Sequence, residues 1–473
     1  MASKDLREFI TNLEKNHSLK RVQREVDWNL EMIHLAKITE ERGGPALLFE
    51  NVRDYPIPVL TSMFGTLSRF ASEFGMKPGA SMNEVTLGYM ELLGRDRVPP
   101  KEVSEGPIFE NIIEGDKVDL YQFPAPKFYP KDGGRYICTN YSLVAKDPET
   151  GWVNLGTYRG QLHDKTHFGL MVQPGKHGWL QMEKWGEKGK KMPAAAVFGG
   201  PPVLFMVSGN EAPYGVSEYE IAGAITGFPI EVIKSDYTGL PIPAYAEIVF
   251  EGEVDPDRST WRTEGPFGEA TGYYSGKPTE KPVFEVKRIL HRNNPIYLAS
   301  TVGRPITDTH IMAAVGRCGR MWRELTDSGI PGIKAVAMHP ASQRFFIISL
   351  KQMYPGHSKQ VLTAAASTPM GNYANKLFVV VDDDVAPDDW TRVLWSVIQR
   401  FDPQRSVEIL KGRRDSFLDP GVEPKKRYPY PLTSTLLIDG CTPYHWEEKP
   451  ELVELDADLV KKIQQEWKEY GLE

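Results

Sequence analysis

The sequence is poor in cysteine, lacks long apolar runs and has no excess of basic residues. Its three cysteines, Cys138, Cys318 and Cys441, are scattered and form no CxxC pair, which argues against a disulfide scaffold or a cysteine zinc site. No apolar stretch reaches transmembrane length, and the first residues lack the apolar segment and cleavage site of a signal peptide. We therefore expect a cytoplasmic protein with reduced thiols.

The charge balance limits the partners. A formal net charge of −7 and a pI near 5.9 provide no attraction to nucleic acid or to an anionic membrane, so we expect neither as a partner. The composition, 41% hydrophobic and 25% charged, is that of an ordinary globular protein. A chain of 473 residues is long enough for two or three domains.

The pattern along the chain changes twice, which predicts three domains. Residues 1–105 combine an amphipathic helix near the start with short strands, as in an α/β region, and end in a polar segment containing prolines. Residues 106–305 contain many strand candidates, including the apolar segment 202–209, and one helix at 217–227. This succession indicates a β-barrel or a β-sandwich.

Residues 306–473 alternate helices and strands and are predicted to form an α/β domain. Helices are expected at 308–327 and 357–367, and the apolar run at 377–381 is typical of a buried parallel strand. The last helix, near 456–471, has apolar residues on one face and needs a surface to pack on. That surface belongs either to the body of the protein or to a second subunit, and we predict at least a homodimer.

The stretch "TEGPFGEATGYY" holds two glutamates, Glu264 and Glu269, around Gly265, Pro266 and Gly268. Glycine and proline make this segment a rigid turn rather than a helix or a regular strand. Two carboxylates in different protonation states can perform acid and base chemistry at neutral pH. The alternative is a tight turn with solvated glutamates.

A second candidate segment is "WVNLGTYRGQL", which contains Asn154 and Arg159. Their spacing places them on opposite faces of a regular strand, so they converge only if the chain bends, for which Gly156 offers a position. An arginine drawn inward here requires a carboxylate partner. An exposed strand arginine is the alternative.

Two further side chains complete a candidate metal site. His177 is expected in a loop of glycine and proline, and Glu218 in the first turn of a helix, where the helix dipole alone would favour a carboxylate. With Asn154 they make a mixed oxygen and nitrogen set that suits Mn²⁺ or Mg²⁺. Their sequence spacing is not diagnostic of a metal site.

Taken together, these segments resemble the UbiD family of reversible decarboxylases. The motifs that carry the resemblance stand in the family's order along nearly the whole chain: "VNLGTYR", "PGKHG", "VSEYEIAG", "EGPFGEATGYY", "TVGRP", "YPGHSK", "VVVDDDV" and "FDPQRSVEIL". The resemblance implies an N-terminal α/β region, a central split β-barrel related to flavin reductases, and a C-terminal α/β domain. It also implies assemblies up to hexamers.

The resemblance implies non-oxidative decarboxylation of an aromatic or α,β-unsaturated acid with prenylated FMN as the cofactor, supplied by a flavin prenyltransferase. A cofactor is needed because CO₂ loss from an sp² carbon leaves electrons that no side chain can accept. By resemblance, Glu269 is the proton donor, Glu264 pairs with Arg159, and Arg159 contacts the flavin. Asn154, His177 and Glu218 match the ligands of Mn²⁺, with K⁺ beside it.

Further residues match cofactor-lining positions of the family. These positions are Thr157, Tyr158, Arg159, Gln173, Pro174, Gly175, Gly178 and Trp179, and Lys359 matches a phosphate contact. An alternative within the family is net carboxylation of a phenol, a phenyl phosphate or an arene in a multi-subunit complex. An alternative of another class is a flavin-binding oxidoreductase or a non-catalytic subunit.

Overall fold

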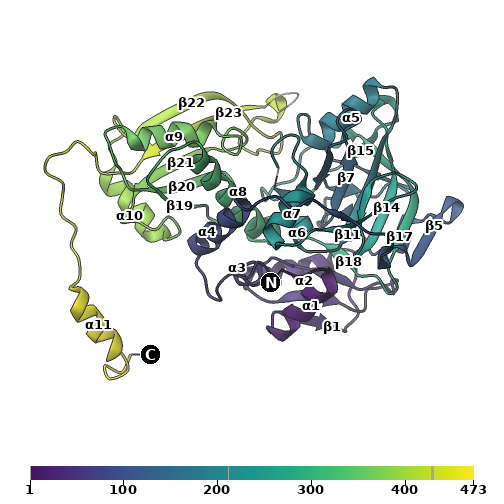
Figure 1. Cartoon of the computed structure of the whole chain (residues 1–473), viewed down its shortest axis with the longest axis horizontal. Coiled ribbons are helices and arrows are strands. Elements are labelled where there is room, and N and C mark those ends of the chain that lie inside the picture. The colour runs from purple at the N-terminus through teal and green to yellow at the C-terminus, as the bar shows by residue number, and fades with distance from the viewer. Residues whose placement is uncertain (1, 211, 428–430, 473) are drawn as a thin grey trace.

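The computed structural model describes residues 2–210, 212–427 and 431–472, and it has two lobes (Figure 1). The N-terminal region and the central strands form one lobe, and the C-terminal sheet forms the other. Two helices that pack against each other, α4 (Met82–Leu93) and α8 (Asp308–Asp327), lie between them. The predicted helix at 308–327 is therefore confirmed.

The N-terminal region combines helices with a four-stranded sheet. Its helices are α1 (Leu6–Lys15), α2 (Glu31–Glu41) and α3 (Leu67–Glu73). The sheet order is β1 (Leu19–Val22), β2 (Ala46–Phe49), β3 (Val59–Thr61) and β18 (Tyr297–Ala299). Since β18 comes from much later in the chain, this sheet ties the N-terminal region to the segment that leads into α8.

The central lobe is built on an antiparallel sheet. Along the sheet the strands are β10 (His167–Gly169), β17 (Val283–His291), β14 (Ala246–Val254), β11 (Met192–Gly199), β7 (Ser142–Lys146) and β8 (Val153–Gly156), with β5 (Asn111–Glu114) also on β17. Among the described residues, β10 and β8 do not pair with each other, so the sheet is open. The mixed α/β character is as predicted.

Smaller elements surround this sheet. One three-stranded sheet comprises β4 (Lys101–Glu102), β12 (Glu231–Lys234) and β13 (Pro241–Pro243). Two ribbons are formed by β6 (Tyr136–Cys138) with β9 (Gly160–Gln161), and by β15 (Arg262–Glu264) with β16 (Thr279–Lys281). The helices are α5 (His177–Glu187), α6 (Val203–Gly209) and α7 (Glu218–Thr226).

Two local predictions in this lobe are wrong. The apolar segment 202–209 is predicted as a strand, but it forms α6, whose residues 203–208 are all buried. A short run that is apolar on every side fits a buried helix as well as a buried strand, so periodicity cannot distinguish them. His177 is predicted in a loop, but it is the first residue of α5, directly after the turn at Gly175.

The C-terminal lobe is an α/β sheet with the predicted parallel core. Its strand order is β19 (Ile333–Ala337), β20 (Phe345–Leu350), β21 (Leu377–Asp382), β23 (Leu432–Asp439) and β22 (Val407–Arg414). The apolar strand β21 pairs in parallel with both neighbours, as its composition predicts. Helices α9 (His357–Ser367) and α10 (Trp390–Arg400) pack on this sheet.

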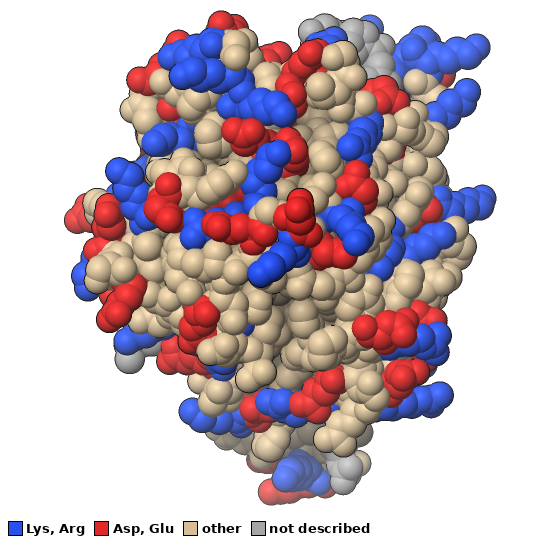
Figure 2. Space-filling model, turned by 90° about the vertical axis from the view of Figure 1, so that its right-hand side faces the viewer, with Lys and Arg blue, Asp and Glu red and all other residues tan. Residues whose placement is uncertain are grey.

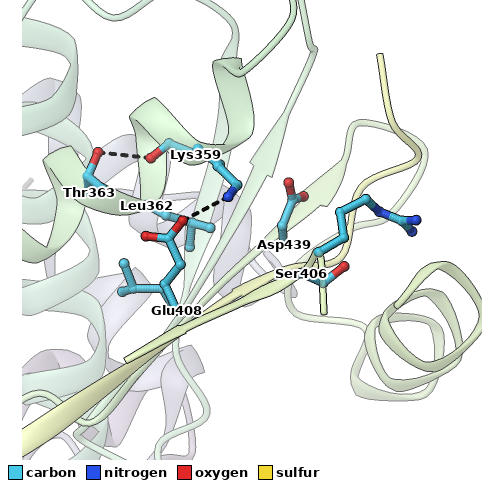
Figure 3. A pocket seen from close by; sticks show the side chains of 8 residues that line it. Lys359, Leu362, Thr363, Ser406, Glu408 and Asp439 are labelled. Atoms are coloured by element: carbon cyan, nitrogen blue, oxygen red, sulfur yellow. Dashed lines mark hydrogen bonds and ion pairs between the residues drawn. The ribbon is translucent and has the colours of Figure 1, made fainter. Parts of the chain in front are cut away.

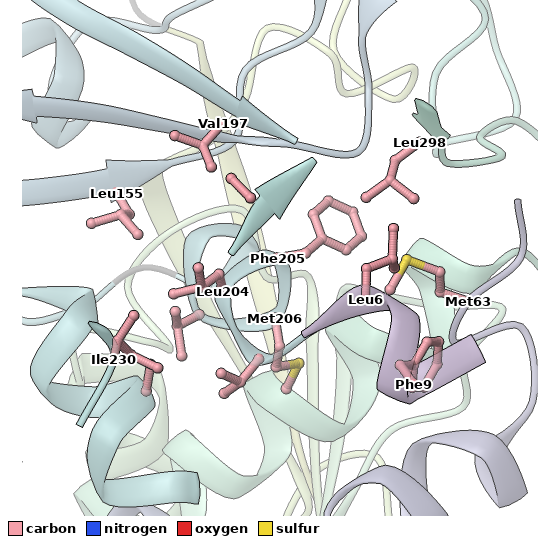
Figure 4. Close-up of a cluster of buried hydrophobic side chains, with 14 of the residues drawn as sticks. Leu6, Phe9, Met63, Leu155, Val197, Leu204, Phe205, Met206, Ile230 and Leu298 are labelled. Atoms are coloured by element: carbon pink, nitrogen blue, oxygen red, sulfur yellow. The ribbon is translucent and has the colours of Figure 1, made fainter. Parts of the chain in front are cut away.

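A buried hydrophobic cluster joins α1 to the central lobe (Figure 4). Leu6 and Phe9 from the inner face of α1 lie with Met63, Phe205 and Leu298 in this cluster. The cluster therefore joins residues near the start of the chain to residues as far along it as Leu298. Burying each such side chain contributes about 1.5–3 kcal/mol, which makes α1 an integral part of the fold.

The last helix, α11 (Ala457–Gln465), lies away from both lobes at the end of an extended segment (Figure 1). None of its residues is buried within this single chain. Among the described residues, no helix combines the length and the apolar character needed to cross a bilayer. On the face shown in Figure 2, basic and acidic side chains are interspersed.

Candidate functional site

The two glutamates of the rigid turn meet on one arginine. Arg159 donates from Nε and Nη2 to the two carboxylate oxygens of Glu264, both at 2.7 Å. Its Nη1 forms an ion pair with Glu269. All three side chains are largely shielded from solvent, with 9%, 0% and 12% exposure for Arg159, Glu264 and Glu269. Bidentate geometry and low exposure make these contacts stronger than a surface ion pair.

Backbone hydrogen bonds hold the turn that carries Glu269. Glu269 N donates to Tyr273 O at 2.9 Å, and Gly268 N donates to Asp132 Oδ1 at 3.0 Å. Gly265 has φ +92°, which favours glycine. Burial raises the pKa of Asp132 to about 6, although its oxygens accept backbone N–H groups. The turn is therefore preorganised by its own chain and by a buried carboxyl group.

Other buried groups surround the Glu264 carboxylate. Tyr136 is fully buried, and its pKa is raised by burial and by the charge of Glu264. Gln161 accepts a hydrogen bond from Gly265 N at 2.7 Å and so fixes the chain just after Glu264. Lys281 lies on the paired strand β16, and burial lowers its pKa. Glu264 is thus held in a low-dielectric environment in which its pairing with Arg159 is favoured.

The three predicted metal ligands come together although they are distant in sequence. Asn154 lies in β8, His177 begins α5 and Glu218 begins α7. His177 Nδ1 lies 3.2 Å from Asn154 Oδ1, and Glu218 accepts a hydrogen bond from Leu155 N at 2.7 Å. No group of three His, Cys, Asp or Glu with metal-site geometry occurs in residues 2–210, 212–427 or 431–472. The trio of Asn154, His177 and Glu218 contains only two residues of these types, and its third member is the amide of Asn154.

A cavity of about 780 Å³ connects these ligands to the C-terminal lobe. One wall contains Asn154, His177 and Glu218, together with Thr157, Tyr158 and Gly175. The opposite wall comes from α8 and from the C-terminal lobe. Basic side chains from both walls face the cavity, namely those of Lys176, Arg317, Arg320 and Arg414. A cavity of this size and charge suits an anionic ligand.

Several predicted cofactor-lining residues have defined local roles. Tyr158 accepts a hydrogen bond from Gly178 N at 3.2 Å, and Thr157 donates to Tyr141 O at 3.0 Å. A Cβ atom at Gly178 would lie 2.9 Å from the Tyr158 hydroxyl oxygen, so this close approach requires glycine. Trp179, 8% exposed, packs edge-on against Trp261 with ring centroids 5.9 Å apart.

The loop before α5 also contacts the C-terminal lobe. Tyr373 donates to Gln173 Oε1 at 2.7 Å, and Arg414 Nη2 donates to Pro174 O at 3.1 Å. Sequence reasoning missed Tyr373 and Arg414, because nothing in their local pattern indicates a contact with residues about 200 positions earlier. Only evidence that the C-terminal lobe packs against the loop before α5 could have pointed to Tyr373 and Arg414.

Lys359 lies apart from the other candidate residues. It belongs to α9 and lines a separate pocket with Glu408 and Asp439 (Figure 3). Its Nζ donates to Glu408 Oε1 at 2.8 Å, and the side chain is 53% exposed. Lys359 does not line the cavity that holds Asn154, His177 and Glu218. Its position in this chain therefore gives no support to the predicted phosphate contact.

Comparison with known proteins identifies the family. Three family models match in order: the 3-octaprenyl-4-hydroxybenzoate carboxy-lyase N-terminal domain at residues 10–86, its Rift-related domain at 101–305 and its C-terminal domain at 310–440. The chain belongs to the UbiD family. It is therefore a carboxy-lyase of the UbiD type, and the mixed α/β fold and the reaction type expected from the resemblance are confirmed.

Individual UbiD relatives match over the full length. An uncharacterized protein of Archaeoglobus fulgidus is 36% identical over 495 residues, covering 99% of each chain. The vanillic acid decarboxylase of Sedimentibacter hydroxybenzoicus in its closed form has a TM-score of 0.89 at 30% identity and 99% coverage of both chains.

The UbiD-class enzyme HmfF of Pelotomaculum thermopropionicum is a further similar structure. Its complex with FMN has a TM-score of 0.83 at 29% identity, covering 97% of this chain and 98% of HmfF. An evolved dimeric form of HmfF was solved with prenylated FMN; its TM-score is 0.79 at 28% identity, with 96% and 99% coverage.

Proposed function

We propose that this UbiD-family chain reversibly decarboxylates an aromatic or α,β-unsaturated carboxylic acid with prenylated FMN, and that Glu269 donates the proton. The observation that carries the proposal is the contact of Arg159 with both Glu264 and Glu269 on a rigid, buried turn. When bound, prenylated FMN supplies the acceptor for the electron pair that remains when the bond to CO₂ breaks.

The protein side of the reaction needs three roles at this cluster. Arg159 provides positive charge near the departing carboxylate. Glu264, by pairing with two nitrogens of Arg159, fixes the plane of the guanidinium group. Glu269 then gives its proton to the carbon vacated by CO₂, and in the reverse direction it removes that proton. The rigid turn keeps the acid in place, which is a positioning effect.

We assign the cofactor to the cavity between the lobes. Thr157, Tyr158, Gly175 and Arg159 are proposed to face the flavin, with Gln173, Pro174, Gly178 and Trp179 fixing the surrounding loop and helix. Basic side chains on both walls suit the flavin phosphate. HmfF, which is similar over nearly its whole length, binds FMN and prenylated FMN. We leave Lys359 out of this site.

The metal is proposed to bind at Asn154, His177 and Glu218, with Mn²⁺ as the preferred ion and K⁺ beside it. Ligands at about 2.1 Å from an ion and at right angles to each other lie about 3 Å apart. The 3.2 Å separation of Asn154 Oδ1 and His177 Nδ1 supports this assignment. The metal would join the protein to the cofactor phosphate, so each would depend on the other.

The finer architecture is also part of this proposal. The isolated bridge between Leu162, just after β9, and Phe168 in β10 brings the β6–β9 ribbon to the edge of the open sheet. We propose that sheet and ribbon together form a split β-barrel like that of flavin reductases. The three domains are proposed to span 1–105, 106–305 and 306–473.

Quaternary structure completes the proposal. The exposed apolar residues of α11 and the segment after it, such as Leu459 and Trp467, are proposed to dock on a second copy, giving at least a homodimer. Light scattering at micromolar concentration should therefore report a dimer or a larger assembly. A monomer that persists at that concentration would contradict this part of the proposal.

The cofactor and the reaction can be tested together. After co-expression with a flavin prenyltransferase, mass spectrometry of the released flavin should show prenylated FMN. A panel of aryl and unsaturated acids, with and without bicarbonate, should then show CO₂ release or the reverse reaction. Purified protein that binds only unmodified FMN and acts on no acid of the panel would contradict the proposed function.

Substitution of Glu218 tests the metal site. Glu218→Ala should lose both metal and flavin, because each neutralises charge on the other. Metal analysis and the flavin absorbance of the purified protein are the readouts, and Glu220→Ala, two positions further along α7, is the control. Full flavin occupancy in a metal-free Glu218→Ala protein would refute the assignment.

A further inference from the structure

His310 connects α8 to the turn that carries Glu269. It lies in the first turn of α8 and is 1% exposed. Its Nε2 lies 2.8 Å from the carbonyl oxygen of Ala270, the residue that follows Glu269. Its Nδ1 lies 2.6 Å from the hydroxyl oxygen of Thr307. Both ring nitrogens therefore have a partner: Ala270 on the turn that carries Glu269, and Thr307 at the N-terminal end of α8.

The carbonyl partner fixes which ring nitrogen must carry a proton. Because a carbonyl oxygen only accepts, Nε2 of His310 carries the proton and donates it to Ala270 O. A hydroxyl can donate or accept, but beside a neutral ring the Thr307 hydroxyl donates to Nδ1 and holds the ring in one tautomer. Burial lowers the pKa of His310 to about 4, which agrees with a neutral ring near pH 7. His310 is thus a fixed donor rather than a proton carrier.

The N-terminal region holds the start of α8 in place. Lys37 Nζ donates to Ile306 O at 3.0 Å, and Glu40 accepts from Asp308 N at 3.2 Å. Both side chains belong to α2. The Asp308 carboxyl accepts from Ser300 Oγ at 3.1 Å. The position of His310 is therefore set by contacts outside the catalytic turn.

We propose that His310 is a positioning residue for Glu269. By holding the Ala270 carbonyl, its Nε2–H keeps the Glu269 carboxyl against Arg159 and directed at the reacting carbon. This inference rests on the proposed function, in which Glu269 is the proton donor. A displacement of about 1 Å in a reacting group can lower a rate about 100-fold. Loss of the His310 contact should therefore lower kcat more than it raises KM.

The test compares substitutions that remove the donor with one that keeps it. His310→Leu removes the donor, His310→Asn is polar but too short to reach Ala270, and His310→Gln can still donate to it. His357→Leu is the control, because His357 is likewise buried, at 0% exposure, and lies in the first turn of another helix, α9. Its Nδ1 accepts from Met353 N, away from the catalytic turn.

Two readouts separate positioning from general destabilisation. In cofactor-free protein, amide hydrogen exchange of the peptide 265–275 should accelerate in His310→Leu and His310→Asn, but not in His310→Gln or His357→Leu. In the loaded enzyme, kcat should fall roughly 10- to 100-fold in the first two variants. Hydrogen–deuterium exchange at the vacated substrate carbon should slow in parallel, and His310→Gln should restore most of both rates.

Two results would overturn the inference. One is unchanged exchange of the peptide 265–275 and unchanged kcat in His310→Asn, which remains decisive if His310→Leu does not fold. The other is an equal loss in His357→Leu, which would mean that any buried histidine has this effect. Glu269→Gln is measured beside them: if it keeps full activity, the proposed acid is wrong, whereas its loss with an active His310→Asn rejects only the role of His310.

Discussion

Two buried clusters in this chain contain the same three groups, one arginine and two carboxyl groups, in opposite arrangements. In the catalytic cluster, Arg159 contacts both Glu264 and Glu269 directly. In the cluster at the start of α8, Arg69 donates instead to backbone carbonyls, those of Gly44 at 2.8 Å and Ser62 at 3.2 Å. The same composition therefore gives charge pairing in one place and separated groups in the other.

The separated cluster consists of Arg69, Glu40 and Asp308, each at most 4% exposed. Burial raises the pKa of both Glu40 and Asp308, and the mutual repulsion of the two carboxylates adds to the effect at Asp308. Burial lowers the pKa of Arg69 to about 10. The carboxyl groups accept from hydroxyl and backbone donors, among them Ser300 and Asp308 N. We infer that this cluster, which is held by hydroxyl and backbone partners, stabilises the fold.

The difference shows that pairing, rather than composition, distinguishes a catalytic cluster from a structural one. Arg159, which directly follows the cavity-lining Tyr158, contacts both of its glutamate partners, so its charge lies close to the ligand cavity. Arg69 and its neighbours are enclosed, where burial favours the protonated form of the carboxyl groups. If this distinction is correct, substitutions in the first cluster should affect rate, and substitutions in the second should affect stability.

The largest expected effect is that of Glu269→Gln on the rate. Glutamine keeps the shape and can hydrogen-bond Arg159 but cannot deliver a proton, so kcat should fall at least about 100-fold. The free energy of unfolding, measured in urea, should change much less. Glu280→Gln, on the exposed side of the neighbouring strand β16, should leave both values unchanged. A Glu269→Gln enzyme of near-normal rate would break the distinction between the clusters.

Arg69→Met should have the opposite profile. It removes the cation beside Glu40 and Asp308 and leaves the Gly44 and Ser62 carbonyls without this donor, so the free energy of unfolding should fall by about 3–5 kcal/mol. The kcat of the folded fraction should change less than it does in Glu269→Gln. Urea denaturation followed by circular dichroism provides the measurement.

The control for Arg69→Met is Arg53→Met. Arg53 pairs with Glu25 and Asp27 on an exposed surface, so its loss should not measurably change the unfolding transition. Equal stability of Arg69→Met and wild type would show that the enclosed arginine is dispensable and that the cluster is not structural.

The smallest expected effect is a change in pH dependence in Glu40→Gln. A carboxyl group whose pKa is raised by folding binds its proton more tightly in the folded state, so its favourable contribution is complete at low pH. That contribution is lost as the pH rises from the ordinary value of 4.5 through the raised pKa. The stability of Glu40→Gln relative to wild type should therefore improve as the pH rises. A stability difference that is constant from about pH 4 to pH 8 would argue against a raised pKa of Glu40 in the folded state.

Local pattern predicted the elements that have a regular period or a marked boundary. The helix at 308–327, the helix at 357–367 and the parallel strand at 377–382 are found as expected. Segment 202–209 was wrongly predicted as a strand, because an unbroken apolar run has neither a helical nor a strand period. The helix that begins at His177 was not predicted, because residues 177–187 have no side-chain cap and little apolar periodicity.

The candidate site likewise has a part that the sequence predicted and a part that it did not. The sequence by itself determined the rigid turn between Glu264 and Glu269, because glycine and proline restrict the backbone regardless of what surrounds them. The resemblance already implied that Arg159 pairs with Glu264. Only the tertiary structure decided that Arg159 also contacts Glu269, that His310 contacts the turn, and that Lys359 lies in another pocket. Such contacts join segments that are far apart in the sequence; Arg159 and Glu269 are 110 residues apart. They depend on how sheets and lobes pack, which no local pattern encodes.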